Sequence, residues 1–96
     1  MTVAWDEAKR ASNLAKHGVD FAIVKAAHFR AALVHADTRV DYGEVRLFAL
    51  VPIADRLHAL VYTIETRAVR IISLRLASQK EVAAYVRETE TDSTDA

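Results

Sequence analysis

Two arginines, Arg70 and Arg75, stand in the segment "VRIISLRLA", which is otherwise apolar enough to be a core strand. A guanidinium is effectively always charged and is costly to bury without a partner, so each arginine needs water, a carboxylate or a bound anion. In an ideal strand Arg75 shares a face with Ser73, and Arg70 lies on the opposite face. Two interpretations stay open. The arginines pair with carboxylates such as Glu65 or Asp55 at the rim, or Arg75 converges with Lys16 or His17 on a phosphate.

A lysine and a histidine, Lys16 and His17, precede Gly18 at the predicted end of the first helix. Cations are favoured there by the helix dipole and by unsatisfied carbonyls, so a structural role explains both residues. The alternative is functional, because a histidine titrates near neutral pH and could donate a proton in a cleft while the lysine holds a phosphate. The spacing alone does not separate these interpretations.

Two tyrosines carry hydroxyls that could reach a site, Tyr62 in "ALVYT" and Tyr85 in "KEVAAY". Tyr85 follows Val82 by three positions and Glu81 by four, so we expect its ring to pack on the sheet while its hydroxyl reaches an edge. A core role with a solvated hydroxyl is the structural alternative to a role in catalysis.

Several familiar sites are absent from the sequence: a glycine-rich phosphate loop, a cysteine nucleophile, a "GxSxG" elbow and a carboxylate cluster for magnesium. His28, His35 and His58 lack the spacing of metal ligands, so we expect no metal site and no cofactor. The remaining Lys, Arg, His, Tyr and Glu side chains suit cleavage of RNA without a metal ion. A base takes the ribose 2′-hydroxyl proton, cations stabilise the phosphorane, and an acid protonates the leaving 5′-oxygen. DNA lacks that hydroxyl and would not be cleaved.

Hydrophobic periodicity predicts an α+β fold. A short strand over residues 3–5 precedes a helix that begins after Asp6 and ends at Gly18, and a second helix follows Asp20. Three apolar segments then predict strands, "VRLFALVPI", "LHALVYTI" and "VRIISLRLA", and the polar stretch "HADTRVDYGE" before them forms either a ragged strand or a loop. Ser78 opens the capping box "SQKE", which predicts the start of a closing helix. We therefore expect a small antiparallel sheet of three to four strands with two N-terminal helices and a C-terminal helix.

The charge balance separates a mildly basic part of the chain from an acidic tail. Residues 1–87 contain all 13 basic residues, whereas residues 88–96, "ETETDSTDA", contain acidic residues and no base. We expect a single domain over 1–87 and a disordered tail over 88–96, which either keeps the protein soluble or competes for the basic surface. The sequence has neither a secretory signal nor an apolar run long enough to cross a bilayer, so a cytoplasmic protein without a membrane partner is expected.

Three segments, taken in order, are similar to those of a known family: "WDEAKRASNLAKHGVDF", "ALVYT" and "VRIISLRLASQKEVAAY". Together they resemble the BrnT family of small ribonuclease toxins, from type II toxin–antitoxin systems, over roughly residues 4–85. The resemblance implies a RelE-like fold, in which a small antiparallel sheet carries helices on one face and an RNA-binding surface on the other. It also implies a cognate antitoxin, usually DNA-binding, that covers the basic cleft and represses the shared operon together with the toxin.

The resemblance also indicates site residues. Lys16 and His17 match the lysine-histidine-glycine segment of the family, and the others match its middle strand, last strand and closing helix. On this basis Arg70 and Arg75 bind the scissile phosphate region, His17 or Tyr85 moves protons, and Lys16 adds electrostatic stabilisation. The candidate catalytic residues are Lys16, His17, Arg70, Arg75 and Tyr85. The candidate substrate-binding residues are Tyr62, Ser73 and Glu81.

The sequence departs from the family pattern where positive charge is expected. Glu65 stands where an arginine is common, the residue after Arg75 is Leu76 rather than a basic residue, and the closing helix is poor in arginine. This loss of charge motivates an alternative from a different class: a catalytically silent toxin-fold module that binds an antitoxin and takes part in operon regulation.

Overall fold

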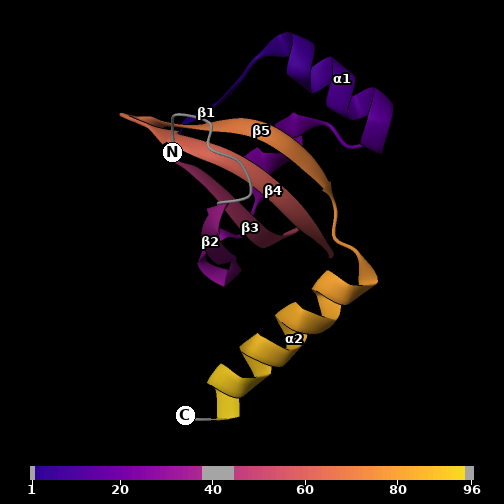
Figure 1. Ribbon diagram of the computed structural model, residues 1–96, viewed down its shortest axis with the longest axis vertical. Coiled ribbons are helices and arrows are strands. Elements are labelled where there is room, and N and C mark those ends of the chain that lie inside the picture. Colours follow the sequence, from indigo (N-terminus) through magenta and orange to yellow (C-terminus); the bar gives the residue numbers. More distant parts are fainter. Residues whose placement is uncertain (1, 38–44, 95–96) are drawn as a thin grey trace.

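The computed structural model describes residues 2–37 and 45–94 of the 96 (Figure 1). In chain order the elements are strand β1 (Thr2–Trp5), helix α1 (Glu7–His17), the 3₁₀ helices η1 (Phe21–Ala26) and η2 (Phe29–Ala31), strands β2 (Leu33–Asp37), β3 (Arg46–Ile53), β4 (Arg56–Glu65) and β5 (Ala68–Leu76), and helix α2 (Gln79–Thr94). The predicted α+β class is confirmed.

The sheet has five strands in the order β1-β5-β4-β3-β2, so the prediction of three to four strands was too low. The prediction of a purely antiparallel sheet was also wrong, because β1 pairs with β5 in parallel. The two strands can run in the same direction because the chain between them is long: it contains α1, both 3₁₀ helices and strands β2, β3 and β4. The possible fourth strand is present as β2, so the first three residues of the polar stretch, 35–37, form a strand rather than a loop. The rest of that stretch, residues 38–44, lies outside the described residues.

The second predicted N-terminal helix is replaced by two short 3₁₀ helices. Asp20 caps η1 as expected, because its side chain accepts a hydrogen bond from the Ala22 amide at 2.9 Å. The helix then buries Phe21 and Val24, which are three positions apart and therefore stack on one side of a 3₁₀ helix. The Ala27 amide donates to the Val24 carbonyl at 3.0 Å, which closes the last turn.

Helix α1 begins and ends at the predicted residues. The Asp6 carboxylate accepts hydrogen bonds from the Ala8 and Lys9 amides, and Gly18 takes the left-handed conformation, with φ 71°, that ends the helix. The Gly18 amide donates to the Leu14 carbonyl at 2.8 Å. Both caps were predicted from the sequence and both are confirmed.

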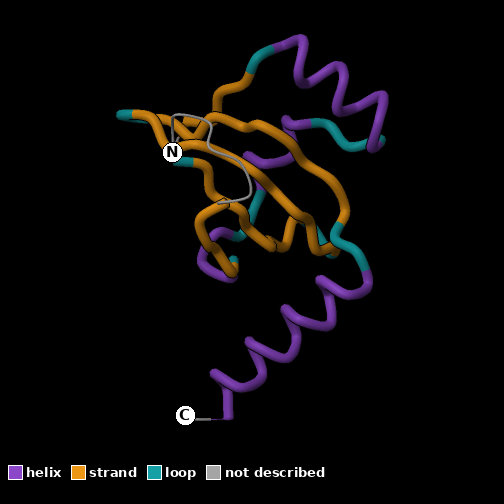
Figure 2. Tube along the Cα trace, viewed as in Figure 1, coloured by secondary structure: helices purple, strands orange, loops and turns teal. Residues whose placement is uncertain are grey.

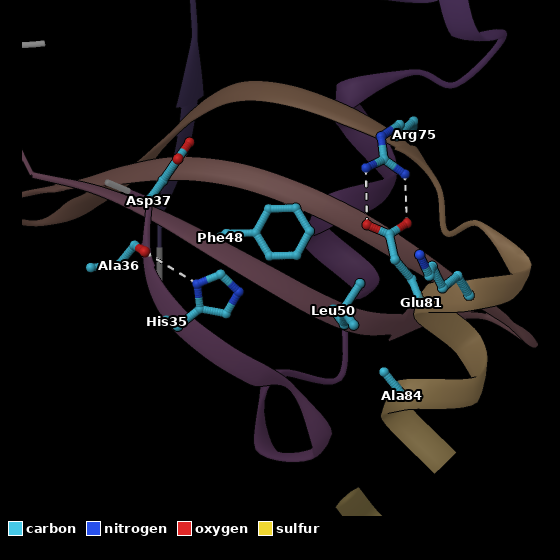
Figure 3. Close-up of a pocket in the computed structure, with 9 residues that line it drawn as sticks. His35, Ala36, Asp37, Phe48, Leu50, Arg75, Glu81 and Ala84 are labelled. Atoms are coloured by element: carbon cyan, nitrogen blue, oxygen red, sulfur yellow. Dashed lines mark hydrogen bonds and ion pairs between the residues drawn. The ribbon is translucent and has the colours of Figure 1, made fainter. Parts of the chain in front are cut away.

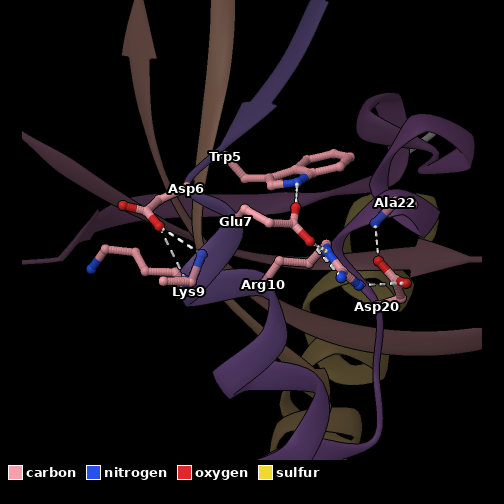
Figure 4. Close-up of polar contacts among 8 residues, drawn as sticks. Trp5, Asp6, Glu7, Lys9, Arg10, Asp20 and Ala22 are labelled. Carbon is pink, nitrogen blue, oxygen red and sulfur yellow. Dashed lines mark hydrogen bonds and ion pairs between the residues drawn. The ribbon is translucent and has the colours of Figure 1, made fainter.

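A polar network joins β1, α1 and the start of η1 (Figure 4). The Trp5 indole donates to Glu7 at 3.2 Å, and the Arg10 guanidinium donates both to Glu7 and to Asp20. Lys25 of η1 lies 5.6 Å from the centre of the Trp5 ring, within cation–π range. The "WDEAKR" segment therefore has a structural role in holding these elements together.

The hydrophobic core lies between one face of the sheet and η1. We call this the packed face. The largest fully buried side chains there come from η1 and from strands β3, β4 and β5, and they are Phe21, Val24, Val51, Leu60, Ile71 and Leu74. The opposite side, which we call the open face, carries the alternate residues of the same strands.

One extra residue in β5 decides what the open face contains. Val61 of β4 pairs with Ser73, but the next residue, Tyr62, pairs with Ile71, so Ile72 is left out of the ladder as a β-bulge. The alternation reverses at this point, and Arg70 lies on the same face as Ser73 and Arg75. The prediction that Arg70 and Arg75 lie on opposite faces was wrong.

The physical reason for the bulge is burial. Val69 and Ile71 are buried on the packed face, and so is Leu74, which is an odd number of positions further along. A regular strand would turn either the first two residues or Leu74 away from the core. The extra residue lets all three contribute to the core.

Asn13 of α1 closes the part of the β5 edge that β1 does not cover. Its side-chain amide donates to the Leu74 carbonyl at 2.7 Å, and its side-chain oxygen accepts from the Leu74 amide at 3.1 Å. The same amide donates to the Val19 carbonyl at 3.2 Å. This buried side chain takes the place of a neighbouring strand and fixes α1 against the sheet.

The closing helix begins at the predicted capping box. The Ser78 amide donates to Glu81 at 2.8 Å, and the Glu81 amide donates to the Ser78 hydroxyl at 3.1 Å. Helix α2 then projects away from the strands (Figure 2). Among the described residues, no helix has the length and apolar character needed to cross a membrane.

The backbone of α2 stays helical through residue 94, where the sequence predicts a disordered tail from 88 onward. Once a helix is nucleated, each further residue adds a hydrogen bond, so polar residues can extend it. Residues 95–96 lie outside the described residues, and a single domain ending at residue 87 stays a prediction.

The edge contact of Asn13 gives a test of the fold. We expect Asn13→Ala to lower the free energy of unfolding by about 2–4 kcal/mol, because it leaves the amide and carbonyl of Leu74 without their partner. Urea unfolding followed by circular dichroism measures the change. The control is Ser12→Ala, at an exposed neighbouring position of α1, and equal stability of the two variants would contradict the role of Asn13.

Candidate functional site

The open face carries polar groups at both ends of a cross-strand row. His35 of β2 pairs with Phe48 of β3, Phe48 with Val61 of β4, and Val61 with Ser73 of β5. Arg75 stands two positions beyond Ser73 on the same face, opposite Ala59. The sheet thus holds an imidazole at one side of this face and a hydroxyl and a guanidinium at the other, with apolar side chains between them.

A groove of about 490 Å³ lies between this face and the first turns of α2 (Figure 3). We call it the α2 groove. The described residues that line it are His35, Ala36, Asp37, Phe48, Leu50, Arg75, Lys80, Glu81 and Ala84. Its floor is apolar, its charged residues are two cations, Arg75 and Lys80, and two carboxylates, Asp37 and Glu81, and His35 places an imidazole on the β2 side. The apolar floor and the two cations suit an elongated anionic ligand with aromatic groups.

Arg75 and Glu81 form a bidentate ion pair at one wall of the α2 groove. The two guanidinium nitrogens lie 2.7 and 3.0 Å from the two carboxylate oxygens. These hydrogen bonds, helped by the Ser78 amide, lower the pKa of Glu81 from its ordinary value of 4.5 to about 2. The pair fixes the direction of the guanidinium and fastens the first turn of α2 to β5.

Arg70 also has a carboxylate partner on the open face. Its Nε atom lies 3.2 Å from Glu65, and both side chains are more than 40% exposed. The interpretation that a β5 arginine pairs with Glu65 is therefore confirmed for Arg70. Arg75 pairs with Glu81 rather than with Asp55. Because the Arg70 pair is in contact with water, it is weak and a stronger anion could displace it.

His35 and Phe48 are groove residues that the sequence reasoning missed. The two rings are stacked, with centroids 5.1 Å apart and planes inclined by 26°. His35 Nδ1 also lies 3.1 Å from the Ala36 carbonyl oxygen. Alternation in "LVHAD" and "VRLFAL" assigns each residue to a face of its own strand, but the pairing of the strands is needed to bring the rings together. Lys80 was missed too, although it stands next to Glu81.

Three of the predicted site residues lie elsewhere. Lys16 and His17 are exposed in the last turn of α1, and neither is among the described residues that line the α2 groove. Tyr62 lies on the packed face, where it is buried and its ring meets that of Phe29 edge-on at 6.1 Å. Burial raises the pKa of the Tyr62 hydroxyl. The structure therefore brings Ser73, Arg75 and Arg70 to one face and keeps Tyr62 on the other.

Tyr85 fastens α2 to the body of the protein. Its hydroxyl donates a hydrogen bond of 2.7 Å to the Ala31 carbonyl, at the end of η2. The hydroxyl does reach an edge, as expected, but its proton is directed at a backbone carbonyl.

Within the described part of the chain, no three His, Asp or Glu side chains are placed to hold a metal ion.

The comparison with known proteins agrees with the motifs. The profile of the family described as "Ribonuclease toxin, BrnT, of type II toxin-antitoxin system" matches residues 5–81. The chain belongs to the BrnT family of ribonuclease toxins. The crystal structure of the Brucella abortus ribonuclease toxin BrnT is a similar solved structure, with 37% sequence identity and a TM-score of 0.65. The alignment covers 82% of this chain and 99% of that chain. No curated protein matches the chain.

The BrnT match includes most of the open-face residues. The matched span contains the bulged strand β5 and ends at Glu81, the partner of Arg75. Tyr85 lies beyond it. The family membership predicted from the three sequence segments is confirmed, and it implies an antitoxin partner for this BrnT-family toxin.

The Arg75–Glu81 pair predicts a pH dependence of stability. Because folding lowers the pKa of Glu81, the pair stabilises the folded protein above the ordinary pKa of 4.5, and this contribution is lost as the pH falls towards about 2. We expect Glu81→Gln to cost about 1–2 kcal/mol at neutral pH. The difference between wild type and variant should shrink steadily in acid.

Urea unfolding over a series of pH values measures this difference. Glu88→Gln, an exposed change further along α2, is the control and should unfold like wild type. A cost of Glu81→Gln that is the same at neutral pH and in strong acid would show that the ion pair does not stabilise the protein.

Proposed function

We propose that this BrnT-family protein is an endoribonuclease that cleaves RNA without a metal ion, at the open face and the α2 groove. The ribose 2′-oxygen attacks the neighbouring phosphorus, the bond to the 5′-oxygen breaks, and the products end in a 2′,3′-cyclic phosphate and a 5′-hydroxyl. The reaction needs cations at the phosphate and groups that accept and donate protons. The groove and its borders offer both kinds of group.

The observation that carries this proposal is the placement of Arg70, Ser73 and Arg75 on one face by the bulge at Ile72. The three side chains follow one another along β5, so successive phosphates of a single-stranded RNA could lie along them. Lys80 adds a further positive charge on the α2 side. Guanidinium groups match phosphate oxygens in geometry and charge, which supports RNA as the anion bound here.

In this proposal Arg75 holds the scissile phosphate, Arg70 and Lys80 hold its neighbours, and Ser73 donates a hydrogen bond to the backbone of the RNA. Glu81 acts through Arg75 by fixing its direction, and Tyr85 acts by keeping α2 in place. A contribution from Lys16, His17 or Tyr62 stays a prediction, because Tyr62 lies on the packed face and Lys16 and His17 lie in the last turn of α1.

We propose also that a cognate antitoxin neutralises the protein by covering the same face. Carboxylates of the antitoxin would replace the RNA phosphates at Arg70 and Arg75, just as Glu65 and Glu81 pair with these arginines within the chain. The antitoxin is the DNA-binding partner in this arrangement, so the toxin reaches operator DNA only through it. Both proteins would act in the cytoplasm, where the RNA substrate is found.

Cleavage of a labelled single-stranded RNA in the presence of EDTA tests the proposal. We expect wild-type protein to leave 2′,3′-cyclic phosphate ends, and Arg75→Ala to lower kcat/KM by about 100-fold or more, because a cation is lost at the phosphate. The control is Arg67→Ala, which removes an arginine that lines a different pocket, beside Tyr62.

Circular dichroism must show that each variant is folded, since removing Arg75 leaves Glu81 without its partner. Arg75→Lys keeps the charge and should recover part of the activity. Equal activity of folded Arg75→Ala and wild type would contradict the assignment of Arg75. Failure of the wild-type protein to cleave any RNA would contradict the endoribonuclease itself.

A second candidate function is a catalytically silent module that binds the antitoxin. The observation that favours it is that both arginines of β5 already have carboxylate partners within the chain. Glu65, which stands where the family often has an arginine, supplies one of them. If these internal pairs exclude RNA, the open face would serve antitoxin binding alone.

The Glu65–Arg70 pair separates the two functions. If RNA binds at Arg70, then Glu65→Gln should tighten the binding of single-stranded RNA by about 2- to 5-fold, because an exposed ion pair costs up to about 1 kcal/mol to displace. Fluorescence anisotropy at low salt measures the affinity. Glu88→Gln removes the same charge from α2 and controls for a general change in net charge. An equal effect of the two substitutions would mean that RNA does not bind at Arg70.

A further inference from the structure

We propose that His35 accepts the proton of the ribose 2′-hydroxyl during RNA cleavage. This inference rests on the proposed function and names a catalytic residue at the same site. His35 lies at the β2 wall of the α2 groove, across from Arg75, and its side chain is exposed to a ligand in the groove. It belongs to neither the bulged strand nor the lysine-histidine-glycine segment.

The hydrogen bond of His35 determines which ring nitrogen is free to accept a proton. Nδ1 lies 3.1 Å from the Ala36 carbonyl oxygen, and a carbonyl can only accept, so Nδ1 carries the hydrogen. In the neutral ring Nε2 then has the lone pair. Figure 3 shows this second nitrogen on the side of the ring that faces away from Ala36 and towards the groove.

The Phe48 ring holds the imidazole in this orientation. The stacked contact, at 5.1 Å and 26°, restricts rotation of the imidazole about its side-chain bonds. Phe48 and His35 are direct partners in the β2–β3 ladder, so the sheet fixes both rings. A base held in place in this way is ready for proton transfer without further rearrangement.

The other charged groups of the groove are less suited to this step. Arg75 and Lys80 are cations and cannot accept a proton from a hydroxyl. Both oxygens of Glu81 accept hydrogen bonds from Arg75, and its lowered pKa makes it a weak base. Asp37 is only 9% exposed, so it offers little surface to a ligand in the groove. Imidazole is the side chain whose ordinary titration range includes neutral pH.

The proposed step balances as follows. The 2′-hydroxyl proton moves to Nε2 of His35 while the 2′-oxygen forms its bond to phosphorus and the bond between phosphorus and the 5′-oxygen breaks. The leaving 5′-oxygen takes a proton from a solvent water, and the imidazolium later returns its own proton to the solvent. Arg75 holds the phosphate oxygens while their negative charge increases.

Cleavage of single-stranded RNA by His35→Gln tests the proposal, with His28→Gln as the control because His28 is exposed and lies outside the groove lining. We expect His35→Gln to lower kcat by about 100-fold or more. Its affinity for an uncleavable RNA with 2′-O-methyl groups should stay within about twofold of wild type, since the step concerns proton transfer rather than binding. His28→Gln should cleave like wild type.

A pH profile and a rescue experiment separate catalysis from structure. The rate of the wild-type protein should rise with pH through the titration range of imidazole, and this rise should be absent in His35→Gln. The groups that face His35 and could shift the midpoint are Asp37 of β2, Arg75 of β5, and Lys80 and Glu81 of α2. Free imidazole should restore part of the activity of folded His35→Ala.

The outcomes distinguish this inference from the proposed function. If wild-type protein cleaves RNA and folded His35→Gln cleaves it within about threefold of wild type, His35 is not the base, and the endoribonuclease stands. A loss of activity with an equal loss of affinity for the 2′-O-methyl RNA would also overturn the inference. If wild-type protein cleaves nothing, both proposals fail together.

Discussion

The bulge at Ile72 is the constraint on which the open face depends. Strand β5 must bury Val69 and Ile71 near its start and Leu74 near its end, and a regular alternation cannot bury all three. The extra residue allows all three side chains to be buried in the core. As a consequence it also turns Arg70 to the side on which Ser73 and Arg75 lie. Hydrophobic burial on one face thus determines the arrangement of cations on the other.

Charges within the chain then balance this cationic face. Glu81 holds Arg75 with two hydrogen bonds and at the same time caps the first turn of α2, so one carboxylate fixes a helix and a guanidinium together. Glu65 holds Arg70 through a single, exposed contact. The two arginines are therefore oriented by partners of different strength. A phosphate can displace Glu65 more easily than Glu81, which suggests that Arg75 keeps its carboxylate partner while RNA is bound.

Sequence reasoning was most successful where a local rule determines the structure. Asp6, Gly18 and the Ser78–Glu81 box are caps with strong residue preferences, and all of them are found as predicted. The class of the fold and the family also follow from short segments. The turn between β3 and β4 gave no such signal, because Ala54 adopts a left-handed conformation, with φ 54°, that usually calls for glycine.

The site was less predictable because strand pairing decides it. Alternation assigned Arg70 to the wrong face, since no local pattern identifies the residue at which β5 leaves the ladder. His35 and Phe48 are 13 positions apart, on either side of residues 38–44, and only the β2–β3 register brings their rings together. Tyr62 matched a family segment, yet its strand position places it in the core.

The central claim is that RNA binds on the open face of the sheet. The most direct measurement is the change in backbone amide NMR shifts when a single-stranded RNA with 2′-O-methyl groups, which cannot be cleaved, is added to the wild-type protein. We expect the largest changes at Ser73 and Arg75 of β5, at His35 of β2 and in the first turn of α2. Changes confined to Lys16, His17 and the packed face around Tyr62 would contradict the claim and place the RNA site elsewhere on the protein.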